Sequence, residues 1–105
     1  MMAATLIVTA HRSDNGAVEL AAVGELDLST VSRFEDALRD AIAEAGPNRT
    51  ALDLRGVEYL DSAAINVLFD HADQISVVRV NPLLLRGLSI SGLDQIVEVR
   101  TAEPD

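Results

Sequence analysis

The sequence contains no cysteine and no lysine, and each absence excludes a class of chemistry. Without cysteine the chain can form no disulfide, thiolate nucleophile or cysteine-ligated metal site, which fits a reducing cytosol. All eight basic residues are arginine, so Schiff-base chemistry and the lysine of a phosphate-binding loop are excluded. Aromatic residues make up 3% of a chain that is 49% hydrophobic, which predicts an aliphatic core.

Positive charge is also scarce, and the formal net charge is -9 at pH 7. An acidic surface repels nucleic acid and anionic lipid, and it suits solubility and a basic partner. No apolar run approaches the roughly 20 residues that span a bilayer, and residues 1–5 lack the basic region of a secretory signal. We therefore expect no nucleic-acid partner, no direct membrane insertion and a cytoplasmic location.

The length of 105 residues allows one domain with a single core. We expect this domain to cover residues 1–105, with its core at about 4–100 and a flexible tail at 101–105. Apolar periodicity and turn residues predict the element order ββαβαβαβ. The predicted strands are 5–11, 17–23, 51–54, 75–80 and 96–100, and the predicted helices are about 29–45, 62–72 and 83–91.

The connections predict how these elements are arranged. Asn15-Gly16 is a strong hairpin signal, so the first two strands should be antiparallel. The later alternation of strands and helices predicts a mostly parallel sheet with helices packed on it, on one face if the strand order does not reverse. Gly24 is expected to close the second strand, and residues 55–60 to form a tight crossing. The fold class is therefore α/β, in one domain.

Ser62 lies where the apolar spacing changes from that of a strand to that of a helix. One interpretation is an N-cap, in which its hydroxyl accepts a hydrogen bond from a free backbone N–H. The other is a phosphorylation site, since a phosphate there would meet free N–H groups and the positive end of the helix dipole. The two interpretations are compatible, and the residues alone leave both open.

Other groups of polar residues give weaker indications of a functional site. His71 lies between acidic residues, but neighbouring helical side chains point about 100° apart, so we expect no metal site. Asp27 and Asp61 both follow strands, at what should be the same edge of a parallel sheet. They are either turn and capping residues or groups that orient Ser62 for a partner. A small hydrolase using these two carboxylates is a remote third alternative, because nothing in so small an aliphatic domain predicts a substrate pocket.

Three motifs in the right order resemble those of the STAS domain family, and in particular of anti-sigma factor antagonists. Asp61-Ser62-Ala63-Ala64-Ile65 resembles the family's DSSGL signature, residues 24–27 match its GELD segment, and residues 90–93 match the SGL ending of its last long helix. The resemblance implies a STAS-like fold. It also implies that a partner anti-sigma factor, a serine kinase, phosphorylates the serine after the aspartate, which is Ser62 here.

The resemblance implies a binding protein that is switched off by phosphorylation and regulates transcription through a sigma factor, with no enzyme activity and no cofactor. The implied partner-binding residues are Asp27, Glu58, Asp61, Ser62, Ala63 and Asn66. Ala63 and Ala64 depart from the signature's serine and glycine, and residue 74 runs almost directly into the next strand. The two alanines support an alternative, a STAS accessory subunit of a membrane transporter or signalling complex, in which Ser62 is only a helix cap.

Overall fold

The computed structural model describes residues 5–101, which form the predicted order of strands and helices with two short 3-10 helices added. The strands are β1 (Leu6–Arg12), β2 (Val18–Leu26), β3 (Thr50–Leu60), β4 (Ile75–Val80) and β5 (Glu98–Thr101). The helices are α1 (Val31–Ala45), α2 (Ser62–Asp70) and α3 (Pro82–Ser91), and the 3-10 helices are η1 (Ala72–Gln74) and η2 (Leu93–Gln95).

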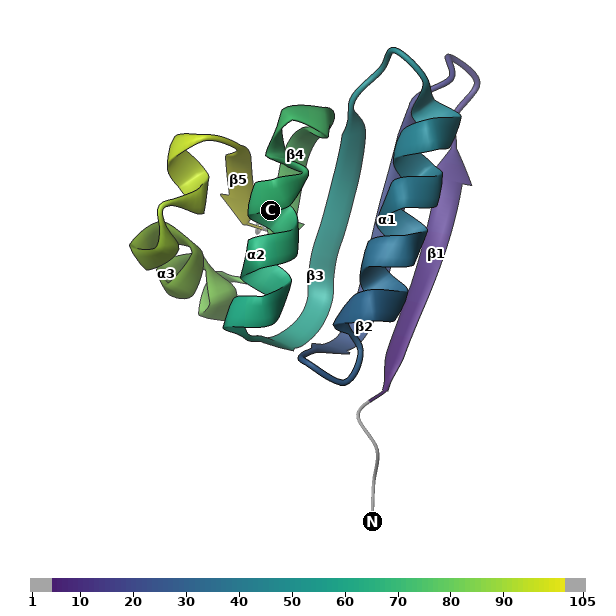
Figure 1. The fold of residues 1–105 in the computed structure, drawn as a ribbon. Coiled ribbons are helices and arrows are strands. Elements are labelled where there is room, and N and C mark those ends of the chain that lie inside the picture. Colours follow the sequence, from purple (N-terminus) through teal and green to yellow (C-terminus); the bar gives the residue numbers. More distant parts are fainter. Residues whose placement is uncertain (1–4, 102–105) are drawn as a thin grey trace.

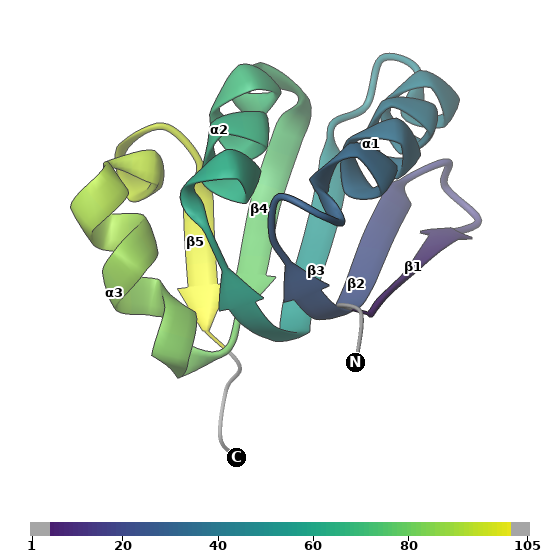
Figure 2. The same ribbon diagram turned by 60° about the horizontal axis from the view of Figure 1, so that its bottom comes forward.

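The five strands of this part of the chain form one sheet in the order β1-β2-β3-β4-β5. β1 and β2 are antiparallel, and every later neighbour pair is parallel, as the sequence predicts. Because the strand order never reverses, α1, α2 and α3 all cover the same face of the sheet (Figures 1 and 2). The result is a two-layer α/β domain.

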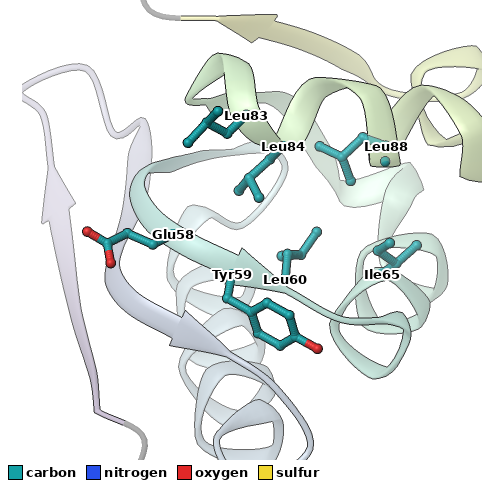
Figure 3. A pocket seen from close by; sticks show the side chains of 8 residues that line it. Glu58, Tyr59, Leu60, Ile65, Leu83, Leu84 and Leu88 are labelled. Atoms are coloured by element: carbon teal, nitrogen blue, oxygen red, sulfur yellow. The ribbon is translucent and has the colours of Figure 1, made fainter.

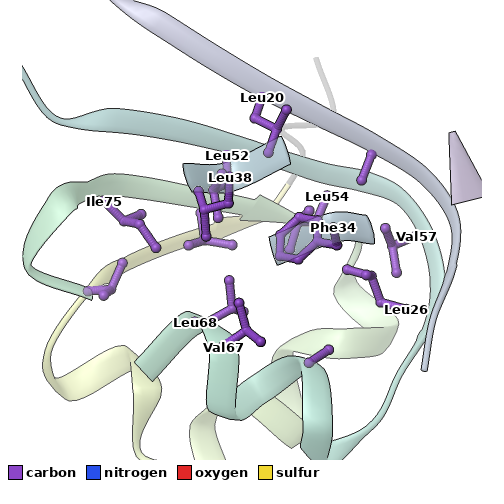
Figure 4. Close-up of a cluster of buried hydrophobic side chains, with 14 of the residues drawn as sticks. Leu20, Leu26, Phe34, Leu38, Leu52, Leu54, Val57, Val67, Leu68 and Ile75 are labelled. Carbon is purple, nitrogen blue, oxygen red and sulfur yellow. The ribbon is translucent and has the colours of Figure 1, made fainter. Parts of the chain in front are cut away.

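The core lies between the helices and the covered face of the sheet, and it is aliphatic as predicted. Figure 4 shows Phe34 and Leu38 of α1 packed among leucines of β2 and β3, with Val67 and Leu68 of α2 beside them. Phe34 is the one aromatic side chain buried within residues 5–101. The opposite face of the sheet carries charged side chains instead, including an Arg79–Glu19 ion pair at 2.8 Å.

The predicted end of the second strand at Gly24 was wrong, because β2 continues to Leu26. Gly24 has a φ of +123°, and a Cβ at this position would lie 2.1 Å from the carbonyl oxygen of Thr5. Glycine therefore lets the two neighbouring strands approach closely while the pairing continues. In the sequence alone, a glycine inside a strand cannot be told from a glycine that ends the strand.

The predicted tight crossing at 55–60 was also wrong, because this segment is the second half of β3. It pairs with the extended β2, and Leu60 lies opposite Leu26. The register shifts twice, and at the second shift β3 carries one extra residue, Glu58, between two paired positions. Such bulges break the apolar alternation by which a strand is recognised in a sequence.

The remaining boundaries agree closely with the sequence. β4 has the predicted bounds, and η1 leads directly into it, which confirms the short connection after α2. The Asn81 side chain caps α3, Pro82 occupies its first turn, and Gly92 ends it in the left-handed conformation. Thr101 belongs to β5 and not to a tail; residues 1–4 and 102–105, and with them the rest of the predicted tail, lie outside the described residues.

None of the helices within 5–101 combines the length and hydropathy needed to cross a bilayer.

Candidate functional site

The candidate site lies at the edge of the sheet where β2 and β3 end side by side. The backbone N–H of Asp61 donates to the carbonyl oxygen of Leu26 at 3.1 Å, which joins the two strand ends. The loop before α1 and the first turn of α2 leave the sheet from this edge together (Figure 1). The prediction that Asp27 and Asp61 lie at the same edge is therefore confirmed.

Asp61 connects two backbone segments through one carboxylate, which accepts from three backbone N–H groups. Its Oδ1 accepts hydrogen bonds from the backbone N–H groups of Ala63 at 3.0 Å and Ala64 at 3.2 Å, which caps α2. Its Oδ2 accepts from the backbone N–H of Leu28 at 3.1 Å, which ties the loop before α1 to the start of α2. Asp61 thus fixes the position of Ser62, which follows it directly.

Ser62 is the first residue of α2, and its side chain is exposed. Of the two interpretations of Ser62, the N-cap was wrong, because the extended backbone of Asp61 (φ -100°, ψ -178°) places the aspartate carboxylate at the capping position. Within residues 5–101 the Ser62 hydroxyl makes no hydrogen bond to another side chain or to the backbone. The hydroxyl is therefore free to react or to contact a partner.

The Asp27 carboxylate is held by its own loop. Its Oδ1 accepts from the Ser29 hydroxyl at 2.6 Å and from the Ser29 backbone N–H at 2.9 Å. These bonds, the Ser29 hydroxyl first, hold the pKa of Asp27 below its ordinary value of 3.8. Thr30 occupies the N-cap position of α1 without a side-chain hydrogen bond into the helix; its hydroxyl instead donates to the carbonyl oxygen of Glu25 at 2.8 Å. Asp27 is therefore an ionised, structurally bonded group at the edge.

The remaining predicted partner-binding residues lie on α2 and on β3. Ala63, the next residue of α2, is half-buried, and Asn66 is exposed one helical turn after Ser62. Glu58 is exposed on the bulge of β3. The structure thus places Asp27 and Asp61 at the joined strand ends and Ser62, Ala63 and Asn66 on α2, whereas Glu58 lies on β3 two residues before the strand ends.

A hollow of about 200 Å³ lies beside these residues, between the end of β3, α2 and α3. Leu60 of β3, Ile65 of α2, and Leu84 and Leu88 of α3 point toward one another there (Figure 3). Glu58, Tyr59, Leu83 and Gly87 complete the lining. Leu83 is 85% exposed and Tyr59 is 53% exposed, so apolar surface continues from the hollow to the solvent.

The sequence did not indicate the contribution of α3 to this surface, nor that of Leu28, which is 79% exposed and bonded to Asp61. One signal was available, because the run Leu83-Leu84-Leu85 is too apolar for the one-sided stripe of a short surface helix. The sequence cannot show what this apolar run contacts, because α3 meets the end of β3 only in the tertiary structure.

The geometry gives no support to catalysis at this edge. His71 lies at the opposite end of α2 from Ser62, about 13 Å away along the helix axis, and its Nε2 lies 3.1 Å from the Glu35 carboxylate of α1. The carboxylates of Asp27 and Asp61 are occupied by loop and helix N–H groups. Within the described part of the chain, no group of three or more His, Cys, Asp or Glu side chains is placed to hold a metal ion.

This arrangement defines a small α/β domain that presents a capped helix start, a free serine and an apolar hollow on one edge, as a protein-binding domain would. The family model described as "Mlab, STAS domain" matches residues 9–98. The chain belongs to the STAS domain family.

The chain is similar to the anti-sigma-F factor antagonist RsfB of Mycobacterium tuberculosis (strain CDC 1551 / Oshkosh), with 30% identity over 97 residues that cover 87% of this chain and 76% of RsfB. Its fold is similar to that of an anti-sigma factor antagonist from Mycobacterium paratuberculosis, with a TM-score of 0.82, 22% identity, and coverage of 91% of this chain and 86% of the other. It is also similar to the Bacillus cell fate determinant SpoIIAA in its phosphorylated form, with a TM-score of 0.64, 14% identity and 92% coverage of each chain.

Proposed function

We propose that this protein is an anti-sigma factor antagonist of the cytoplasm, which binds an anti-sigma factor with serine kinase activity and releases a sigma factor. The observation that carries the proposal is the exposed, unbonded hydroxyl of Ser62 at the start of α2, held in place by the Asp61 cap. The similarity to RsfB, which is named as an antagonist, supports the same role.

Phosphorylation of Ser62 is the proposed switch. The kinase transfers the γ-phosphoryl group of ATP to the Ser62 hydroxyl, which loses its proton as the ester bond forms and ADP leaves. The product adds a charge of roughly -1.5 to -2 at the centre of the proposed interface. Asp61 already occupies the first N–H groups of α2 with its own negative charge, so the phosphate meets like charge rather than a free helix terminus. The modified surface then repels the partner.

Affinity capture tests this proposal with wild type, Ser62→Ala and Ser62→Asp as baits in lysate of the source organism. We expect an ATP-binding anti-sigma factor kinase to be captured by wild type and Ser62→Ala but not by Ser62→Asp. Ser76→Asp is the matched control, because Ser76 is exposed at the opposite end of the sheet, near the start of β4. Equal capture of the kinase by Ser62→Ala and Ser62→Asp would overturn the switch.

The purified kinase then gives the direct test. Incubation with ATP should add one phosphate to the wild type and none to Ser62→Ala, as read by intact-mass spectrometry. Phosphate at another residue of the Ser62→Ala variant would contradict the assignment of the site.

A second candidate function is an accessory subunit of a membrane transporter or signalling complex. The observation that favours this candidate is Ala63 and Ala64 in place of the serine and glycine of the antagonist signature. Ser62 would then be an exposed residue without a capping role, since Asp61 caps the helix. Capture of the same transporter subunits by all three baits would support this candidate against the first.

A further inference from the structure

We propose that the hollow beside α3 receives an aliphatic side chain of the anti-sigma factor, from a segment in which that residue neighbours an arginine or lysine. The inference rests on the proposed function for the partner and adds the chemistry by which that partner docks. It assigns to Gly87 the role of keeping the docking site open.

The size and lining of the hollow suit a side chain. An apolar cavity of about 150 Å³ holds one benzene molecule, whereas sites for drug-sized ligands begin near 300 Å³. The hollow measures about 200 Å³, and Figure 3 shows Leu60, Ile65, Leu84 and Leu88 pointing toward one another around it. One leucine-sized or isoleucine-sized group therefore fits, inserted from a partner surface.

Gly87 accounts for the opening. It lies inside α3, where glycine is a poor helix former compared with alanine. No backbone requirement explains it, since its φ is not positive and a Cβ there would meet no atom within 4 Å. Gly87 lines the hollow and lies three and four residues after Leu84 and Leu83, on the same helix face, so a larger side chain at this position would occupy space at the hollow. Gly87 is therefore unfavourable for the helix itself, but its lack of a side chain leaves the hollow open.

The charge near the hollow favours a basic residue next to the inserted side chain of the partner. None of the residues that line the hollow is basic, and Glu58 is acidic. The Glu58 carboxylate extends from β3 on the side away from Leu60, Leu84 and Leu88 (Figure 3), so it lies outside the hollow and can attract only a partner residue that neighbours the inserted one. An acidic partner segment is repelled by this carboxylate and by the net charge of -9. A basic residue next to the inserted group is attracted and orients the segment.

The first test uses defined probes and needs no kinase. The ¹H–¹⁵N NMR spectrum of the full chain is recorded during titration with N-acetyl-leucyl-arginine amide and, separately, N-acetyl-leucyl-glutamate amide. We expect the arginine probe to shift the amide signals of Ile65, Gly87 and Leu88 at lower concentration than the glutamate probe. Gly87→Leu should abolish these shifts, and Ser62→Asp should keep them. No shift at these residues, equal shifts by both probes, or unchanged shifts in Gly87→Leu would overturn the inference.

The second test uses the kinase recovered by Ser62→Ala, measured by isothermal titration calorimetry. Gly87→Leu should weaken binding about tenfold or more, as blocking a central apolar contact does. Arg86→Leu adds apolar bulk at the adjacent exposed position, which does not line the hollow, and should leave affinity within about twofold of wild type. Gly87→Ala, a smaller change that favours the helix, should give an intermediate affinity with an intact fold.

The two proposals fail in different ways. If Ser62→Asp loses the kinase while Gly87→Leu binds it like wild type, the phosphorylation switch stands and docking in the hollow is wrong. If Gly87→Leu weakens binding while Ser62→Asp does not, the hollow is used and the switch is wrong. Concentration-dependent shifts at Gly87 without any probe would assign the hollow to a second copy of the chain and overturn the inference.

Discussion

The Oδ2 atom of Asp61 accepts a hydrogen bond from the backbone N–H of Leu28, which lies 33 residues earlier in the chain, at 3.1 Å. The other oxygen of the same carboxylate caps α2. One side chain therefore fixes both the helix that begins with Ser62 and the loop that faces it. The sequence of a strand, an aspartate and a serine thus has a structural role that is independent of any partner.

Asp61→Ala should lower the free energy of unfolding by about 1–2 kcal/mol, because the N-terminal N–H groups of α2 lose their cap. Asp61→Asn should cost less, since its side-chain oxygen can still cap the helix while its amide nitrogen cannot accept from Leu28. Urea unfolding of the three proteins measures both effects. An alanine variant as stable as the asparagine variant would show that the cap contributes nothing.

Ser62→Ala should change the free energy of unfolding by no more than about 0.5 kcal/mol, as is usual for an exposed residue without a hydrogen bond. The structure assigns the cap to Asp61, so the loss of the Ser62 hydroxyl leaves the helix start unchanged. The same urea experiment gives the result. A loss near 1 kcal/mol would instead indicate that Ser62 itself caps the helix in solution.

The carboxyl group of Asp27 should titrate below its ordinary pKa of 3.8, because the Ser29 hydroxyl and backbone N–H bond to the ionised form. A lowered pKa in the folded state means that this group stabilises the fold above its unfolded pKa. The stabilisation is lost as the pH falls below about 3.8 and through the folded-state value. NMR detection of the carboxyl carbon measures the pKa directly.

Ser29→Ala should raise the pKa of Asp27 toward its ordinary value by removing the hydroxyl that contributes most to the shift. Ser13→Ala is a suitable control, because Ser13 is an exposed serine that bonds only within the β1–β2 turn. An Asp27 pKa that stays low in Ser29→Ala would mean that the backbone N–H groups alone produce the shift.

Gly87→Ala should raise the free energy of unfolding by about 0.5–1 kcal/mol, because alanine is the better helix former and the space around this position is open. Gly24→Ala is the contrasting change. Its Cβ would lie 2.1 Å from the carbonyl oxygen of Thr5 at a φ of +123°, so we expect a loss above about 2 kcal/mol. Thermal or urea unfolding distinguishes the two, and equal effects would contradict the account of both glycines.

Local signals in the sequence were enough wherever one element is defined by its own residues. Asn81 and Pro82 mark the start of α3 and Gly92 marks its end, because capping, a fixed φ and a left-handed residue act within one helical turn. The buried residues of α1, Phe34, Leu38, Ala41 and Ala45, recur at helical spacing, which is a signal that the helix carries in its own sequence. The motif around Asp61 and Ser62 gave the family and the position of the candidate serine.

The errors lie where the conformation depends on a neighbouring strand. Residues 55–60 lack the alternation of a strand because β3 bulges at Glu58, and they are held extended by pairing with β2. Gly24 looks like a strand end, and only the approach of the Thr5 carbonyl shows why glycine is needed inside a strand. The cap of α2 is a different case: whether Asp61 or Ser62 caps the helix depends on the backbone angles of Asp61, which the sequence does not show.

The sequence by itself therefore determined the order of elements, the aliphatic core, the acidic surface and the place of Ser62 at the start of a helix. The tertiary structure alone decided that Asp61 caps this helix and that Leu28 is tied to it. It also decided that Glu58 and Tyr59 at the end of β3 meet Gly87 of α3 around one hollow. The physical reason is distance along the chain: periodicity and capping act over a few residues, whereas a surface built from β3, α2 and α3 exists only after parallel strands bring their ends to one edge of the sheet.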